Sequence, residues 1–212
     1  MLKDVELKDV VDLVITKKYK KGEIIFLQGD VSDKLYIINT GKIKIFKYTK
    51  ESKEQIVYLL SEGDVIGDLN LLKKGSFEFN AEALEDVILC TISKQDFDGI
   101  LRKNPDIALR MLENVHDRVV SLEKLVQTLS TKDIEARIAS MLINFIGDFG
   151  CECNGEMELN IPLNREEMAN FIGITRETLS RKLTGLQELG IIDLVLNKKI
   201  VIKDMKRLKD RA

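Results

Sequence analysis

Residues 173–183, GITRETLSRKL, decide the fold predicted for the last third of the chain. Thr175 can cap a helix that continues to Gly190, because a threonine hydroxyl accepts a hydrogen bond from a free backbone N–H of the first turn. Asn164 can cap a shorter helix in the same way, and Gly173 ends that helix. Two short helices joined by a turn of about three or four residues that contains glycine form a helix-turn-helix.

The second of these helices has two different faces. Three leucines project to one side at about 100° per residue: Leu179, Leu183 and Leu186. The opposite arc carries the polar side chains Glu177, Ser180, Arg181 and Thr184. Arginine can donate two hydrogen bonds to guanine O6 and N7, and glutamate can accept one from cytosine N4. Serine can hydrogen-bond to a base of either strand. The sequence therefore predicts that Glu177, Ser180 and Arg181 read DNA bases, against the alternative of an ordinary solvated face.

A DNA-binding domain also needs contacts to phosphates, which fix its position on the duplex. Residues 191–204, IIDLVLNKKIVIKD, read as a β-hairpin with Asn197, Lys198 and Lys199 at its tip. A hairpin of this kind forms a wing whose lysines suit the DNA backbone. The residues predicted to contact the backbone are Arg165, Thr175, Arg176, Lys198 and Lys199.

Composition and charge fit a folded protein of two domains. Of the 212 residues, 44% are hydrophobic and 32% are charged, which excludes a disordered chain. From Ile161 onward there are 11 Lys/Arg and 7 Asp/Glu, a balance of +4, so the preceding residues carry 22 bases and 28 acids, a balance of −6. No apolar run approaches the ~20 residues of a membrane span. The acidic N-terminus lacks the pattern of a secretory signal, and three cysteines suit a reducing compartment, so we expect a cytoplasmic protein with no membrane partner.

The first half of the chain reads as short strands. In residues 34–48, KLYIINTGKIKIFKY, Ile43 and Ile45 alternate with lysines, which is the period of a half-buried strand. Similar runs closed by Gly or Asx turns are GEIIFLQGD (22–30), EQIVYLLSEGDVIGDLNLL (54–72) and AEALEDVILCTIS (81–93). Short strands with turns at this spacing predict a small all-β barrel or sandwich.

A different period begins after Asn104. Seven apolar residues follow at alternating spacings of four and three: Ala108, Leu112, Val115, Val119, Leu122, Val126 and Leu129. This narrow heptad seam favours a helix that pairs with the same helix of a second copy, over a helix packed on a globular core. The polar residues 130–133, STKD, then separate it from a new helix capped by Asp133.

The order of these features resembles the Crp/Fnr superfamily of bacterial transcription regulators over nearly the whole chain. The resemblance rests on the glycine-punctuated strands, the heptad helix, DIEARIASML (133–142) and TRETLSRKL (175–183). It implies an α+β chain with a jelly-roll-like β-roll sensor domain over 1–103, a dimerisation helix over 104–130 and a winged helix-turn-helix over 131–212. The Glu-x-x-Ser-Arg form of the second helix is similar to the Fnr branch, which implies an inverted repeat with TTGAT-like half-sites. The implied partners are double-stranded DNA, a second copy of the chain and RNA polymerase.

The predicted effector segment departs from the cyclic AMP receptor branch of that superfamily. In that branch a GELGL turn is followed by an Arg-Ser pair that holds the cyclic phosphate, whereas here the corresponding stretches read GDLNLL (67–72) and GSFEFNA (75–81). The resemblance places the effector pocket at Gly67, Asp68, Leu69, Phe79 and Asn80. No arginine precedes Arg102, so a cyclic phosphate would lack a bidentate partner. We therefore expect an effector other than cyclic AMP.

The cysteines and the single histidine limit the cofactors. An iron–sulfur cluster of the Fnr type needs about four thiolates, whereas the first cysteine here is Cys90, in an apolar strand where a core role is expected. Cys151 and Cys153 form a C-x-C pair in a predicted surface loop. Two thiols can respond to redox conditions but cannot alone complete a tetrahedral zinc site, so no metal site is predicted. His116 lies in the heptad helix, where a surface or interface position and a haem ligand both stay open, and the cofactor stays unidentified.

An enzyme is the alternative class of function. A cupin-like β-barrel metalloenzyme with an appended helical domain would account for the strands, but it needs clustered histidine and carboxylate ligands. The chain has one histidine, far from the strands. We therefore expect no catalytic residues.

Overall fold

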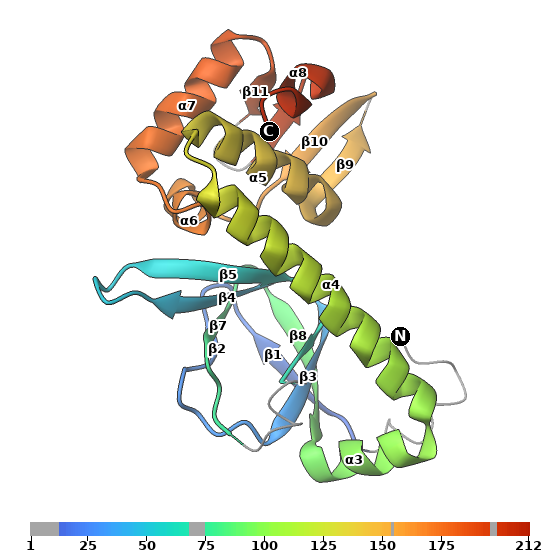
Figure 1. The fold of residues 1–212 in the computed structure, drawn as a ribbon. Helices are drawn as coiled ribbons and strands as arrows, with labels where there is room; N and C mark the ends of the chain where they lie inside the picture. The colour runs from blue at the N-terminus through green and yellow to red at the C-terminus, as the bar shows by residue number, and fades with distance from the viewer. Residues whose placement is uncertain (1–12, 68–74, 154, 196–198) are drawn as a thin grey trace. The chain divides into compact units, whose positions relative to one another are not determined.

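The computed structural model describes residues 13–67, 75–153, 155–195 and 199–212 (Figure 1). Close packing divides the chain into two compact units, one of Met1–Lys47 with Val57–Val120 and the other of Tyr48–Ile56 with Ser121–Ala212. None of the helices within the described ranges is long and apolar enough to cross a membrane.

The first unit contains most of the β-roll, whose two sheets also include Tyr48 and Glu54–Ile56 of the second unit. One sheet has the order β1-β8-β3-β6, with β1 (Ile15–Tyr19), β8 (Val87–Ser93), β3 (Lys34–Thr40) and β6 (Val65–Ile66). The other has the order β2-β7-β4-β5, with β2 (Ile24–Phe26), β7 (Asn80–Ala83), β4 (Ile43–Tyr48) and β5 (Glu54–Leu60). The strand pairs β1–β8, β3–β8 and β4–β7 are antiparallel, which confirms the predicted all-β fold of this half.

Side chains from both sheets meet in one apolar core. Ile43 and Ile45 of β4 are buried in it, as their alternation predicted, together with Ile38 of β3. Phe26 of β2 stacks on Phe77 with ring centroids 3.7 Å apart. The two stacked rings are each 5% exposed and therefore form part of the buried core.

The sequence pattern predicted that the lysines of β4 face solvent, and this prediction is wrong for Lys44. Its side chain is only 4% exposed and lies opposite Glu82 of β7, with Nζ 3.3 Å from Oε2. Nζ is also 5.1 Å from the centroid of the Phe46 ring. A buried ammonium persists where a carboxylate and hydrogen bonds replace the water it has lost, and this partner lies on another strand.

Two helices follow the roll. Helix α3 (Lys94–Lys103) is capped by Ser93, whose Oγ accepts a hydrogen bond from Asp96 N. Helix α4 (Pro105–Ser130) covers the predicted heptad region. Its Ile107 packs into a second core cluster with Phe97 and Ile100 of α3. The heptad residues Leu112, Val119 and Val126 are instead exposed.

The second unit is a helical domain with one sheet. Helix α5 (Ile134–Phe149) begins at the predicted cap Asp133, whose carboxylate accepts from Glu135 N at 2.8 Å. The sheet has the order β11-β12-β10-β9, with β11 (Ile192–Val195), β12 (Lys199–Ile202), β10 (Glu156–Asn160) and β9 (Gly150–Cys153). The helices α6 (Arg165–Phe171), α7 (Arg176–Glu188) and α8 (Met205–Lys209) complete the unit.

Two predictions in this unit are wrong in detail. Cys151 and Cys153 do not lie in a loop, because β9 pairs with β10 from Gly150 to Cys153. Lys199 does not lie at the tip of the wing, because it is the first residue of β12 and pairs with Val195. Cys151 and Cys153 lie on the edge strand β9, whereas Lys199 lies on β12 between β11 and β10.

Candidate nucleic-acid interface

The helix-turn-helix is formed by α6 and α7, and local hydrogen bonds set both starts. Asn164 Oδ1 accepts from Glu167 N at 3.0 Å, while Glu167 Oε2 accepts from Asn164 N at 2.8 Å, a complete capping box. Thr175 Oγ1 accepts from Thr178 N at 3.3 Å. The predicted caps of both helices are thereby confirmed.

The turn between the helices depends on Gly173. Its φ is +68°, a left-handed conformation that favours glycine, and an added Cβ would lie 3.4 Å from Cδ2 of Leu129. Ile174 N donates to Ala169 O at 3.0 Å and closes the turn. The start of α7 is therefore set relative to α6 by backbone geometry.

Helix α7 presents the two faces that its sequence predicted. Leu179, Leu183 and Leu186 are buried in the domain core. The exposed residues on the other side are Arg176, Glu177, Ser180, Arg181 and Thr184. In the described part of the chain, neither Glu177 nor Arg181 makes a hydrogen bond or an ion pair, so both side chains are available to a ligand. A guanidinium fork and a carboxylate on one exposed helix face are suited to the edges of base pairs.

Residues that the sequence analysis missed hold α7 against the first helix of its domain. Glu135 of α5 binds Lys182 through Oε2 at 3.2 Å and Arg211 through Oε1 at 3.1 Å. Lys182 neighbours Arg181 in sequence but points to the packed side of the helix. Such a cross-helix pair has no sequence signature, because the partners are far apart along the chain.

The predicted backbone contacts occupy different environments. Arg176 is exposed at the first turn of α7, whereas Arg165 is half-buried at the start of α6. Burial lowers the pKa of the Arg165 guanidinium from its ordinary value. Lys199 Nζ lies 2.6 Å from Glu158 Oε2 of β10, so phosphate binding by Lys199 would compete with this pair. Lys198 lies outside the described residues.

Family comparisons agree with this geometry. A model of the cyclic nucleotide-binding domain matches residues 16–104, and a model of the Crp-like helix-turn-helix domain matches residues 136–211. Electron transport regulator A of Shewanella oneidensis is 32% identical over 200 residues, which are 94% of this chain and 79% of that protein. The chain belongs to the Crp/Fnr family.

Other members of the Crp/Fnr family are similar along almost the full length. Transcriptional activator protein FnrL of Cereibacter sphaeroides is 26% identical over 98% of this chain and 84% of that protein. The solved structure of FixK2 from Bradyrhizobium japonicum has a TM-score of 0.81 at 22% identity and covers 93% of this chain and 96% of its own, which shows the shared fold. The chain is therefore a DNA-binding transcription regulator of the Crp/Fnr type and not an enzyme.

The predicted effector segment lies only partly within the described residues of this Crp/Fnr regulator. Gly67 has a φ of +91°, and an added Cβ would lie 2.7 Å from Lys34 O, so the position requires glycine. Asp68 and Leu69 lie outside the described residues. Asn80 is buried, where its Oδ1 accepts from Gln28 N and its Nδ2 donates to Phe46 O. Phe79 contacts Tyr58 edge-on, with ring centroids 6.0 Å apart.

The remaining residues singled out in the sequence are His116 and the three cysteines. His116 is exposed on α4. Cys90 is half-buried in β8 and does not belong to the core. Its neighbours Val87 and Leu89 on this strand face the core instead. Cys151 and Cys153 are half-buried on β9, with sulfur atoms 3.3 Å apart.

Proposed function

We propose that this Crp/Fnr regulator is a homodimer that reads an inverted repeat with TTGAT-like half-sites. The observation that carries the proposal is the exposed group Glu177, Ser180 and Arg181 opposite the buried leucines of α7. Arg181 would hydrogen-bond guanine, Glu177 would accept from cytosine and Ser180 would contact either strand. Arg165, Thr175, Arg176, Lys198 and Lys199 would contact phosphates, and RNA polymerase would be the further partner at the promoter.

The heptad face of α4 supports a symmetric dimer. Leu112 is 63% exposed, Val119 47% and Val126 62%, although all three are apolar. These residues repeat every seven positions, which is the spacing that places them on one face of a two-stranded coiled coil. The other seam residues are Ala108, Val115, Leu122 and Leu129, which are half-buried. Pairing of two copies along this seam would cover the exposed row and set two recognition helices about 34 Å apart.

We further infer that the effector is not cyclic AMP. Phe77 is 5% exposed and is stacked on Phe26, and Asn80 uses both ends of its amide on backbone atoms. Phe77 has no polar group to offer a phosphate, and the Asn80 amide is buried and already hydrogen-bonded at both its oxygen and its nitrogen. No arginine precedes Arg102. A hydrophobic small molecule, a gas bound through haem, or a dimer that is competent without a ligand would each fit this chemistry.

Selection from random DNA tests the DNA site. Purified protein is incubated with duplexes that contain a randomised segment, and the bound pool is sequenced. We expect TTGAT and its complement to be enriched as an inverted repeat with centres about one helical turn apart. Enrichment of single, unpaired half-sites would contradict the dimer, and enrichment of unrelated sequences would contradict the assignment of the base-reading residues.

Calorimetry tests the effector. Cyclic AMP and cyclic GMP are titrated into the protein, and we expect no binding tighter than about millimolar, or ~4 kcal/mol. A micromolar isotherm with one site per subunit would overturn this part of the proposal. The DNA-binding part would stand in that case, because it depends on the other domain.

A further inference from the structure

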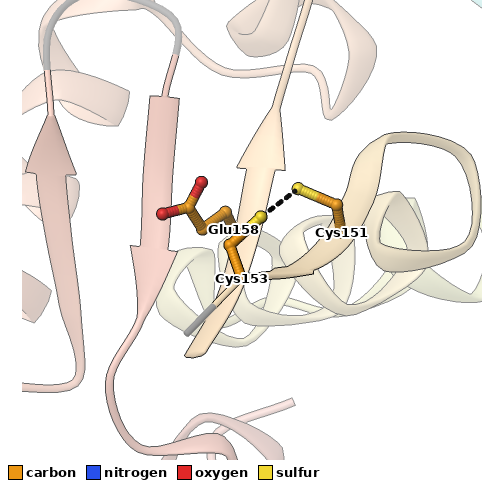
Figure 2. A group of neighbouring side chains, drawn as sticks. All are labelled: Cys151, Cys153 and Glu158. Carbon is orange, nitrogen blue, oxygen red and sulfur yellow. Dashed lines mark hydrogen bonds between the residues drawn. The ribbon is translucent and has the colours of Figure 1, made fainter. Parts of the chain in front are cut away.

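Three metal-binding donor atoms converge on the β9–β10 hairpin. Cys151 and Cys153 are two residues apart in β9, so they project from the same face of the strand. Glu158 of β10 is the cross-strand partner of Cys151. The two sulfur atoms are 3.3 Å apart, and they lie with a carboxylate oxygen of Glu158 within 4.8 Å of one another (Figure 2).

We propose that Cys151, Cys153 and Glu158 form a binding site for a thiophilic divalent cation of the Zn²⁺ class, with water in the fourth position. Two thiolates and one carboxylate are donors that Zn²⁺ accepts in a tetrahedral site. With zinc–sulfur bonds of about 2.3 Å, the sulfur atoms of such a site are about 3.8 Å apart. The observed 3.3 Å requires them to separate by about 0.5 Å, which a small rotation of either half-exposed side chain provides. The sequence alone predicted no metal site because the third donor comes from another strand.

Neighbouring residues orient and balance these donors. Lys199 of β12 binds Glu158 Oε2 at 2.6 Å, and the glutamate side chain is only 17% exposed. A carboxylate has two oxygens, so one can hold the lysine while the other binds a cation, and groups that hold a metal ligand in this way fix its orientation. Asn160 Nδ2 lies 3.7 Å from Cys151 Sγ and donates a hydrogen bond to it.

The formal charges of the site sum to zero both before and after the cation binds. Before binding, two neutral thiols, Glu158 and Lys199 sum to zero. A dication that displaces the two thiol protons leaves two thiolates, the carboxylate, the lysine and the metal, which again sum to zero. Binding of the cation therefore leaves no uncompensated charge on this half-buried face.

A redox-active disulfide fits the same residues less well. In an extended strand, Cα atoms two residues apart are about 6.6 Å from each other. That separation lies near the upper limit of about 6.8 Å for a disulfide. A cation needs no such approach of the backbone, because it lies between the sulfur atoms.

Metal titration of the reduced, full-length protein tests the site. Zn²⁺ is titrated in competition with a chromophoric chelator, and Co²⁺ is used as an optical probe of the ligands. We expect one ion per chain with a Kd below about 1 µM. The cobalt form should show a thiolate-to-metal charge-transfer band and the intense visible bands of four-coordinate geometry.

Substitutions identify the donors. Cys151→Ser and Cys153→Ser should each weaken binding by more than about 100-fold, since losing a residue that binds the metal costs more than losing one that only orients such a residue. Glu158→Gln should also weaken binding, and Lys199→Gln should weaken it by about 10-fold. Cys90→Ser is the matched control, because it removes a half-buried thiol in the other unit and should leave the metal affinity unchanged.

A measurement on the protein without substitutions tests the same site even if the variants fail to fold. Zn²⁺ should slow alkylation of Cys151 and Cys153, but not of Cys90, when modified peptides are quantified by mass spectrometry. Absence of one-to-one binding, or metal affinity unchanged by Cys151→Ser, would overturn the proposal. Full affinity in Glu158→Gln, or a disulfide that forms in air and is indifferent to Zn²⁺, would overturn it as well.

Discussion

Helix α7 allows a direct test of the proposed base reading, because it carries two adjacent basic residues, Arg181 and Lys182. Arg181 is exposed and makes no hydrogen bond or ion pair in the described part of the chain. Lys182 is the next residue, but its Nζ is held 3.2 Å from Glu135 on α5. Arg181→Ala and Lys182→Ala therefore remove the same charge from the same turn of α7, one from the exposed face and one from the packed face.

The expected magnitudes differ in DNA binding and in stability. A bidentate contact to guanine is worth ~1–3 kcal/mol of discrimination, so Arg181→Ala should weaken binding to the cognate repeat by roughly 5- to 140-fold. Its effect on the free energy of unfolding should be below about 0.5 kcal/mol, since the side chain is exposed. Lys182→Ala should cost about 0.2–1 kcal/mol of stability, as a half-exposed ion pair does, and leave base preference unchanged.

A third variant separates folding from recognition. Leu183 is fully buried, so Leu183→Ala should lower the free energy of unfolding by ~2–5 kcal/mol. Its effect on DNA binding should disappear at temperatures where the variant is folded and its α7 is intact.

Fluorescence anisotropy with labelled cognate and scrambled duplexes measures the discrimination, and urea unfolding measures stability. We expect Arg181→Ala to lose affinity for the cognate duplex alone and to bind the scrambled duplex nearly as before. Equal losses on both duplexes would show that Arg181 contacts phosphates, and the base-reading role would be refuted. A loss of base preference in Lys182→Ala equal to that in Arg181→Ala would show that the two faces of α7 have been misassigned.

Three further predictions concern other parts of the chain. Val119→Lys with Val126→Lys should bury like charges across the seam and give monomers in analytical ultracentrifugation, and a variant that stays dimeric would contradict the heptad assignment. Lys44→Ala should lower the free energy of unfolding by about 3 kcal/mol, because the charge of Glu82 loses the ammonium 3.3 Å away, and adding Glu82→Gln should recover part of the loss in chemical denaturation. Thr175→Ala should lower the free energy of unfolding by about 1 kcal/mol, because it removes the cap of α7. Thr175→Ser keeps the hydroxyl and should retain stability, so it is the control in thermal unfolding.

Local chemistry made much of this structure predictable. The caps at Asp133, Asn164 and Thr175 use hydrogen bonds that span two or three residues, so the residue types and their spacing contain the whole signal. The two faces of α7 follow from helical periodicity for the same reason. Family resemblance then supplied the order of the domains and the class of function, which the comparisons confirm.

Other features depend on strand register and on packing between distant segments. Local patterns did not predict β1, β9, β10, α3 or α8, which are short or polar on one face. The burial of Lys44 depends on Glu82 arriving opposite it on another strand. Glu135 meets Lys182 and Arg211 only after α5, α7 and the end of the chain have packed.

The C-x-C pair shows the same division within a single site. The sequence by itself determined that two thiols lie two residues apart, and with the strand period it would place them on one face. Tertiary structure alone decided that Glu158 joins them and that Lys199 holds its carboxylate, since β10 and β12 must first pair in register. Contacts within one turn or one strand are set by covalent spacing, whereas contacts between strands exist only once the chain has folded.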